Sequence, residues 1–447
     1  MEEIDTLLSA SWVLPIIPRR KIFENYSVAI DNGIIIDLLP TKKALKKYQA
    51  NTSLNLNNQV LMPGLINAHT HASMNLFRSL ADDLPLLDWL QNYIWPVEKK
   101  FINADTVKAG VQLAMAEMIR GGTTYFNDMY FFPLDAAEVI IKTGMRATGS
   151  LVLMNVPTKW AKNEKDYLKK IKTVYKQHPN SDLINWILMP HAPFTCSDES
   201  LREIKRLSDE LNLTVHSHAH ETLNDIALDV KKYHCRPLER FFRADLLNDK
   251  LSLAHVVHLT QYEMHLLKDN NVNVIHCPES NMKLGNGIAN MARLAKMGIN
   301  VALGTDGAAS NNDLDMFGEM RSAALIAKGV TQNPTVFSDF EVLEMATING
   351  AKAVGLENVI GSIEKGKSAD IIAVDLSHYF TQPIYNPASL LVYAANRLQV
   401  SHVWVKGNLL LQEEKFKTLD IEKVLADVNQ YAIKIKKFAQ IPRVHRV

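Results

Sequence analysis

Eight short apolar runs, separated by stretches with helical periodicity, repeat between about residue 60 and about residue 330 of this 447-residue chain. Such alternation is typical of a parallel β-sheet whose strands are joined by helices. Eight units favour a closed, TIM-like (β/α)8 barrel over an open doubly wound sheet, although periodicity alone does not separate the two. The runs cover residues 59–69, 123–129, 145–154, 183–191, 213–220, 250–258, 272–277 and 299–306.

The two ends of the chain carry short strand patterns of a different kind. Residues 5–60 include a run broken by Asn32-Gly33, a dipeptide that suits a two-residue hairpin turn. We therefore expect the barrel over residues 61–361 and a small composite β-sandwich domain built from residues 1–60 and 362–447. The charged amphipathic tail at 413–440 predicts a terminal helix, which could serve a homo-oligomer.

Composition argues against several classes of protein. A formal net charge of +1 gives no reason to expect nucleic acid or an acidic membrane surface as a partner. The three cysteines are too few and too scattered for a disulfide framework or a thiolate zinc site. The start of the sequence lacks the basic residues of a secretory signal, and no apolar run reaches the roughly 18 residues of a membrane span. We therefore expect a cytoplasmic enzyme that acts on a small molecule.

Histidines stand at the carboxyl ends of the predicted strands, where barrels of this kind build their active sites. His69 and His71 end the first strand, and residues two apart point to the same side of a strand, so both imidazoles can face one ion. Taken alone, the pair fits two surface histidines in a loop equally well. His216, His218 and His220 share the same parity in the fifth strand, so the pattern does not choose among them.

Asp306 follows the last predicted strand. A lone aspartate there would be interpreted as the N-cap of the next helix. Its placement together with the strand-end histidines favours a metal ligand instead. Three histidines and one carboxylate suit zinc or iron(II) and leave room for a water molecule. We expect one divalent metal, with Zn²⁺ preferred and Fe²⁺ as the alternative.

Several segments resemble the amidohydrolase superfamily, and the resemblance covers nearly the whole chain. PGLINAHTH is similar to its first-strand metal motif, and LGTDGAASNNDLDMFGEM to the eighth-strand motif of the branch that contains chlorohydrolases and aminohydrolases. HAHET resembles the fifth-strand motif, in which the histidine three residues before the glutamate binds metal, and this selects His218. LAHVVH places the functional histidine of the sixth strand at His255. The fourth strand ends in His191 and lacks the lysine of binuclear members, which implies a single metal.

Within that branch, LLDWLQNYIWPVEKKF and MPHAPFTCS resemble deaminases of 5'-methylthioadenosine and S-adenosylhomocysteine. The resemblance implies that Glu98 holds the ribose hydroxyls of a nucleoside substrate and that His191 contacts the nucleoside. Without it, Glu98 would be interpreted as an exposed helix-end carboxylate and His191 as a histidine at the barrel rim. The implied reaction removes the 6-amino group by hydrolysis and gives the inosine derivative and ammonia.

Such a reaction needs a nucleophilic water and two proton transfers. Asp306 would take the proton of the water, and His255 would orient the water or stabilise the oxyanion. Glu221 would donate a proton to a purine ring nitrogen, so Glu221 and Asp306 also contact the substrate. The carboxyl of Glu221 would either keep its proton because it lies in an apolar pocket or receive a proton relayed from Asp306. Ser280 and Asn281 fit the wall of the pocket and a structural loop equally well.

Rival functions share the fold. A guanine or cytosine deaminase, or a triazine chlorohydrolase, would carry the same metal ligands and differ in the pocket. A non-catalytic barrel scaffold would have lost ligands, whereas here every ligand position is filled. The stretch SLVLMNVPTKWAKNEK contains no arginine to grip the carboxylate of S-adenosylhomocysteine, although Lys159 or Lys162 could partly substitute. We therefore expect the methylthio tail to be preferred.

Overall fold

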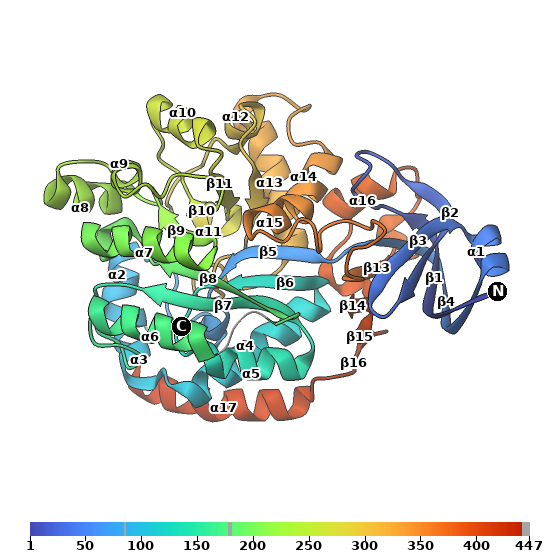
Figure 1. Ribbon diagram of the computed structural model, residues 1–447, viewed down its shortest axis with the longest axis horizontal. Helices are drawn as coiled ribbons and strands as arrows, with labels where there is room; N and C mark the ends of the chain where they lie inside the picture. The colour runs from blue at the N-terminus through green and yellow to red at the C-terminus, as the bar shows by residue number, and fades with distance from the viewer. Residues whose placement is uncertain (85, 178–180, 440–447) are drawn as a thin grey trace, which may run out of the picture.

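The computed structural model describes residues 1–84, 86–177 and 181–439. Its larger part is a barrel of eight parallel strands in sequential order, surrounded by helices (Figure 1). The barrel closes where the backbone N–H of Asp306 donates to the carbonyl of His69 at 3.0 Å. The predicted closed barrel is confirmed, and each predicted run overlaps one of its strands: β5 (Leu65–Thr70), β6 (Thr123–Asp128), β7 (Arg146–Leu153), β8 (Ile184–Pro190), β9 (Val215–Ala219), β10 (Leu251–His255), β11 (Asn273–His276) and β12 (Val301–Leu303).

Helices follow the strands because the intervening segments combine an apolar face with a capping residue. In the helix after β8, Ser197 is the N-cap, and its Oγ accepts from the N–H of Ser200 at 3.1 Å. Leu201, Ile204 and Leu207 are buried on one face of that helix, as their spacing predicts. The helices around the barrel are α4 (Ala104–Arg120), α5 (Pro133–Thr143), α6 (Glu164–Gln177), α7 (Asp198–Leu211), α8 (Leu223–Tyr233), α9 (Pro237–Arg243), α10 (Gln261–Asp269), α11 (Pro278–Lys283), α12 (Met291–Lys296), α13 (Met316–Thr331), α14 (Asp339–Met345), α15 (Ile348–Ala353) and α16 (Pro387–Tyr393).

Strands from both ends of the chain form the second sheet beside the barrel (Figure 1). Its strand order is β16-β15-β14-β13-β4-β1-β2-β3, so the late strand β13 pairs antiparallel with the early strand β4. Asn32 and Gly33 have φ of 48° and 75° in the hairpin turn that their sequence predicts. The elements are β1 (Glu2–Val13), β2 (Phe23–Asp31), β3 (Ile34–Pro40), α1 (Thr41–Lys47), β4 (Tyr48–Pro63), β13 (Ile371–Asp375), β14 (Val400–Val405), β15 (Asn408–Gln412) and β16 (Lys415–Phe416).

Gly64 separates the two sheets. The predicted strand at 59–69 is in fact two strands, because β4 ends at Pro63 in the small sheet and β5 begins at Leu65 in the barrel. A Cβ atom on Gly64 would lie 2.0 Å from Oγ1 of Thr124, so this close passage of two strands requires glycine. The chain therefore enters the barrel directly from the small sheet.

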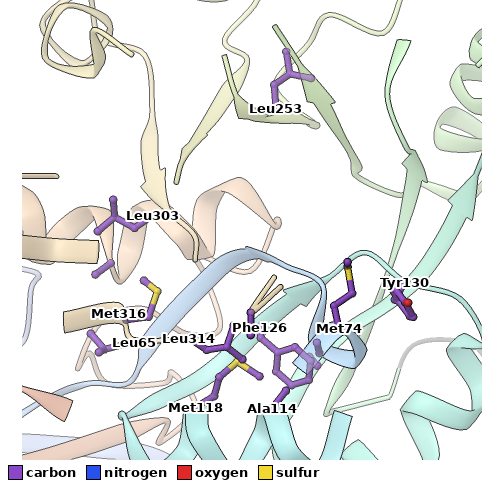
Figure 2. Close-up of a cluster of buried hydrophobic side chains, with 14 of the residues drawn as sticks. Leu65, Met74, Ala114, Met118, Phe126, Tyr130, Leu253, Leu303, Leu314 and Met316 are labelled. Atoms are coloured by element: carbon purple, nitrogen blue, oxygen red, sulfur yellow. The ribbon is translucent and has the colours of Figure 1, made fainter. Parts of the chain in front are cut away.

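The largest hydrophobic core lies between the barrel and its helices. Leu65 and Phe126 from the strands pack there with Ala114 and Met118 of α4 (Figure 2). The terminal helix α17 (Ile421–Phe438) packs against α4; Gln440 of the predicted tail lies outside the described residues. Among these residues no helix is long and apolar enough to cross a membrane.

Short irregular helices stand between the strands and the main helices. The segment before α4 forms η1 (Ala72–Phe77), α2 (Leu86–Asp88), the π-helical turn η2 (Trp89–Ile94) and α3 (Trp95–Phe101). The others are η3 (Pro193–Thr195), η4 (Tyr379–Thr381) and η5 (Arg397–Gln399). The segment from α2 to α3 borders a cavity over the carboxyl ends of the barrel strands.

Candidate metal centre and the cavity around it

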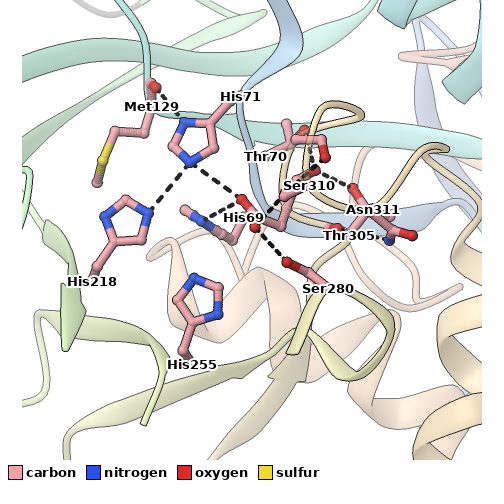
Figure 3. A network of polar contacts seen from close by, with 12 residues as sticks. His69, Thr70, His71, Met129, His218, His255, Ser280, Thr305, Ser310 and Asn311 are labelled. Atoms are coloured by element: carbon pink, nitrogen blue, oxygen red, sulfur yellow. Dashed lines mark hydrogen bonds and ion pairs between the residues drawn. The ribbon is translucent and has the colours of Figure 1, made fainter. Parts of the chain in front are cut away.

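The four predicted metal ligands lie together at the carboxyl ends of the strands. Figure 3 shows the three histidines, His69, His71 and His218. Nε2 of His69 and Nε2 of His71 are 3.4 Å and 3.3 Å from the same oxygen, Oδ1 of Asp306. Nε2 of His218 is 3.3 Å from Nε2 of His71. Three nitrogens and one oxygen thus face a common point, which is the arrangement expected of a ligand set.

The hydrogen bonds around these imidazoles leave their Nε2 atoms available. Nδ1 of His71 donates to the carbonyl of Met129 at 2.8 Å, and Nδ1 of His218 donates to the carbonyl of His191 at 2.7 Å. Each outer hydrogen bond fixes the tautomer whose Nε2 carries a lone pair. Nε2 of His69 is buried and has no hydrogen-bond partner among the described residues. A buried nitrogen of this kind needs a partner, and a metal ion would supply one.

The structure gives different surroundings to His216 and His218 of β9 and to His220, which directly follows the strand. His216 points away from the common point: its Nε2 lies 2.8 Å from Nδ1 of His69, and its Nδ1 lies 2.9 Å from Oγ of Ser252. His220 has a left-handed backbone, with φ of 54°, and its Nε2 accepts from the N–H of Leu238. His218 is therefore the member of the three that faces His71.

The charges of the cluster favour a cation. Burial lowers the pKa of His69 to about 4 and lowers the pKa of His218 well below its ordinary value. Burial would raise the pKa of Asp306, but the neighbouring His69 and His71 hold it well below its ordinary value. Burial would likewise lower the pKa of His71, yet Asp306 raises it to about 9. Neutral imidazoles and an ionised carboxylate bind cations, and an arriving cation would displace the proton of His71.

Two hydroxyl groups orient the carboxylate of Asp306. Oγ of Ser280 and Oγ of Ser310 each donate to its Oδ2 at 2.7 Å. Oδ1 is thereby turned toward the histidines. Ser280, whose role the sequence leaves open, thus supports the ligand set. Ser310 was not predicted, although it stands four residues after Asp306 in the same motif and its type would have allowed the contact.

Glu221 and His255 lie beside the cluster. Oε2 of Glu221 is 3.9 Å from Nε2 of His255, and Nδ1 of His255 is 2.9 Å from Oδ1 of Asn281. Oε1 of Glu221 accepts from Nδ2 of Asn286 at 2.9 Å. Burial raises the pKa of Glu221 to about 7, so this carboxyl can hold a proton at neutral pH. Asn286 was not predicted, because it reaches Glu221 from a loop 65 residues away.

The opposite wall of the cavity is built by the segment from α2 to α3 and by the loops after β6 and β8. Glu98 of α3 accepts a hydrogen bond from the hydroxyl of Tyr130 at 2.5 Å. His191 also lines the cavity, and its Nδ1 lies 3.1 Å from Oγ1 of Thr195. Trp89 and Trp95 also line this space. The histidine cluster and the carboxylate of Glu98 therefore line the same cavity.

Comparison with known proteins places this geometry in a family. The sequence profile described as "Amidohydrolase family" matches residues 60–410. The chain belongs to the amidohydrolase family. A 5-methylthioadenosine/S-adenosylhomocysteine deaminase from Saccharophagus degradans is 42% identical over 432 residues, which are 97% of this chain and 97% of that protein.

Solved structures agree with this membership. The crystal structure of an adenosine deaminase from Xanthomonas campestris with bound zinc has a TM-score of 0.96 and 42% identity, and the match covers 98% of this chain and 99% of that one. A guanine deaminase from C. acetobutylicum with bound guanine is more distant, with a TM-score of 0.79 and 25% identity over 90% and 99% of the two chains. These findings confirm the predicted enzyme class, a hydrolytic deaminase of the amidohydrolase family.

Proposed function

We propose that this amidohydrolase removes the 6-amino group of adenosines modified at the 5' position, with 5'-methylthioadenosine as the preferred substrate. The observation that carries the proposal is the cavity itself. It has a metal-ligand cluster with a protonatable carboxyl at one end and a second carboxylate, Glu98, at the other. A nucleoside has a reacting base and a pair of ribose hydroxyls at matching ends. The likeness to deaminases of such nucleosides supports the same assignment.

The residues that would hold the metal are His69, His71, His218 and Asp306. Nitrogen and carboxylate donors in this number suit Zn²⁺, and the zinc in the similar adenosine deaminase supports that choice over Fe²⁺. When bound, the ion would lower the pKa of a water molecule from its bulk value toward roughly 7. All other steps fall to side chains of the chain.

Deamination breaks the bond between C6 and the amino nitrogen and joins C6 to the oxygen of water. Asp306, with its carboxylate oriented by Ser280 and Ser310, would accept one proton of the water and pass it to the amino nitrogen, which leaves as ammonia. Glu221 would donate a proton from Oε2 to N1 of the purine, because Oε1 already accepts from Asn286. As the 6-oxo group forms, the remaining proton of the water would return to Glu221. The raised pKa of Glu221 supports retention of this proton by burial, without a compulsory relay from Asp306. His255, anchored on Asn281, would orient the water.

The 5' end of the substrate would enter a second space beside Glu98. This space of about 230 Å³ shares Trp95, Glu98, Phe131 and Met154 with the main cavity and continues to Val156, Pro157 and Trp160. Most of these side chains are apolar and suit a methylthio group. Nζ of Lys159 is already bonded to the carbonyl of Lys100 at 2.5 Å. Of the two lysines that line this space, Lys99 would be left to face the carboxylate of a zwitterionic homocysteine tail, as a point charge without the bidentate geometry of arginine.

A substrate panel tests the proposal. On the zinc-loaded enzyme, kcat/KM should be highest for 5'-methylthioadenosine, followed by S-adenosylhomocysteine and adenosine. Guanine and cytosine should react poorly, because a free base leaves the buried carboxylate of Glu98 without its partners. A preference for a free base would reject the substrate while keeping the metal site. A preference for S-adenosylhomocysteine would reject only the argument from the apolar 5' space.

A further inference from the structure

Tyr130 is the side chain that fixes the carboxylate of Glu98. Its hydroxyl donates to Oε1 of Glu98 at 2.5 Å, and within the described chain this is the hydrogen bond that the Glu98 side chain makes. The two residues come from different parts of the fold. Glu98 belongs to α3, in the segment of short helices, whereas Tyr130 follows the barrel strand β6. The contact therefore ties a recognition group to the barrel.

Tyr130 is itself firmly held. Its side chain is buried, with 4% of the residue exposed, and its ring lies 5.1 Å from the ring of Phe131. Its backbone N–H donates to Oγ of Ser150 on β7 at 3.0 Å. The preceding residue, Met129, accepts the hydrogen bond from His71. Because the same short stretch contacts both His71 and Glu98, it sets the position of the carboxylate relative to the histidine cluster.

A carboxylate that receives two vicinal hydroxyls must present its oxygens in one orientation. A free glutamate side chain rotates about its last bond, and this freedom would be lost on binding. The hydrogen bond from Tyr130 occupies one lone pair of Oε1 and stops that rotation, which leaves the other lone pairs for the two hydroxyls. Burial raises the pKa of Glu98, and the Tyr130 hydroxyl opposes that rise, so the same contact favours the accepting, ionised form.

We propose that Tyr130 is a positioning residue for substrate selection, which orients Glu98 so that the enzyme discriminates substrates with a ribose diol from substrates without one. The inference rests on the proposed function, since it requires that Glu98 contacts the ribose. It goes beyond that function by placing part of the selectivity in a residue whose hydroxyl acts through Glu98. The loss of this hydroxyl should weaken diol recognition and leave the chemical step intact.

The experiment compares 5'-methylthioadenosine with its 2',3'-dideoxy analogue on the zinc-loaded, full-length enzyme. The ratio of their kcat/KM values measures diol discrimination. In Tyr130→Phe this ratio should fall about tenfold or more, as expected for a hydrogen bond to a charged group. The fall should come from a higher KM for the diol substrate, with kcat within about threefold of its original value. Glu98→Asp, which withdraws the carboxylate but keeps the Tyr130 ring, should lower the ratio as well.

Tyr125→Phe is the matched control. Tyr125 lies on β6, the strand that Tyr130 follows, is fully buried, and its hydroxyl makes an equally short contact of 2.5 Å, with Oγ1 of Thr148 in place of Glu98. The control should leave the ratio unchanged. A third variant, Glu98→Gln, tests whether Glu98 contributes to diol discrimination at all. If Glu98→Gln lowers the ratio, the inference is overturned by an unchanged ratio in Tyr130→Phe or by an equal loss of kcat on both substrates. If Glu98→Gln leaves the ratio unchanged, the ribose clamp of the proposed function is itself wrong.

Discussion

The two ends of the cavity are built in different ways. At the metal end, the ligands stand on the ends of β5 and β9 and just after β12, and buried hydrogen bonds hold each of them. At the other end, Glu98 stands on a short helix that follows a π-helical turn, and among the described residues its carboxylate has one hydrogen-bond partner, Tyr130. In the proposed function, the barrel thus holds the residues for the chemistry, whereas the segment from α2 to α3 holds the residue for substrate recognition. Changes at the first end should abolish turnover, and changes at the second should redirect it.

Removal of one histidine ligand should have the largest effect. His218→Ala should lose most of the metal affinity, because three remaining donors cannot complete the shell. His216→Ala removes only the partner of His69 Nδ1, so we expect a loss of about 10–100-fold in affinity. His220→Ala should bind normally. Metal content after dialysis against a chelator of known affinity provides the measurement. Full retention in the His218 variant together with loss in a neighbour would show that another histidine is the ligand.

Replacement of Glu221 should separate metal binding from turnover. Glu221→Gln should keep the metal and lose about 10²–10⁴-fold in kcat, the usual contribution of a general acid. Since burial raises the pKa of Glu221 to about 7, the active protonated form is present below that pH. In the original enzyme kcat should therefore fall as the pH rises through about 7. Metal loss in Glu221→Gln, or normal turnover at saturating substrate, would exclude this role.

Replacement of Glu98 tests the recognition end. Glu98→Gln should lower kcat/KM for 5'-methylthioadenosine by about 10–100-fold, since charged hydrogen bonds to the ribose are replaced by neutral ones. The metal content should remain full, because Glu98 lies outside the ligand cluster. Steady-state kinetics with metal analysis of the same sample provide the measurement. A variant that loses metal along with activity would show that the two ends are not independent.

The smallest effect is expected in the loop that contacts Glu221. Asn286→Ala removes the hydrogen bond to Oε1 of Glu221, so the carboxyl can rotate and either oxygen can carry the proton. We expect kcat to fall about fivefold, since one hydrogen bond contributes about 1 kcal/mol. KM and metal content should change little. A change in KM alone would assign Asn286 to substrate contact instead.

The sequence alone predicted more of the metal-ligand cluster than of the surroundings of Glu98. Placement at strand ends was enough to bring His69, His71 and Asp306 together, because parallel strands deliver their carboxyl ends to one face. Strand-end placement could not choose among His216, His218 and His220, since all three occupy alternate positions that face the same side of an extended strand. The choice depends on how each side chain is oriented by its partners, such as Ser252 for His216. The resemblance to the family made that choice.

The recognition end was not readable from periodicity. Glu98 and Tyr130 are 32 residues apart, and their contact depends on how a short irregular segment folds back over the barrel. The first barrel strand shows a similar limit. One continuous apolar run at 59–69 concealed a change of sheet, because Pro63-Gly64 keeps the chain extended while β4 and β5 pair with different neighbours.

The pairing of β13 with β4 affects the order in which the chain can fold during synthesis. β4 ends at Pro63 and β13 begins at Ile371, so about 300 residues must be translated before β4 gains its second neighbour. At roughly 5–20 residues per second, this interval is about 15–60 seconds. Until then β4 is an open strand edge, which can pair with other chains. Chains truncated within the barrel would therefore leave residues 59–63 of β4 without the partner that β13 provides, and this open edge favours aggregation.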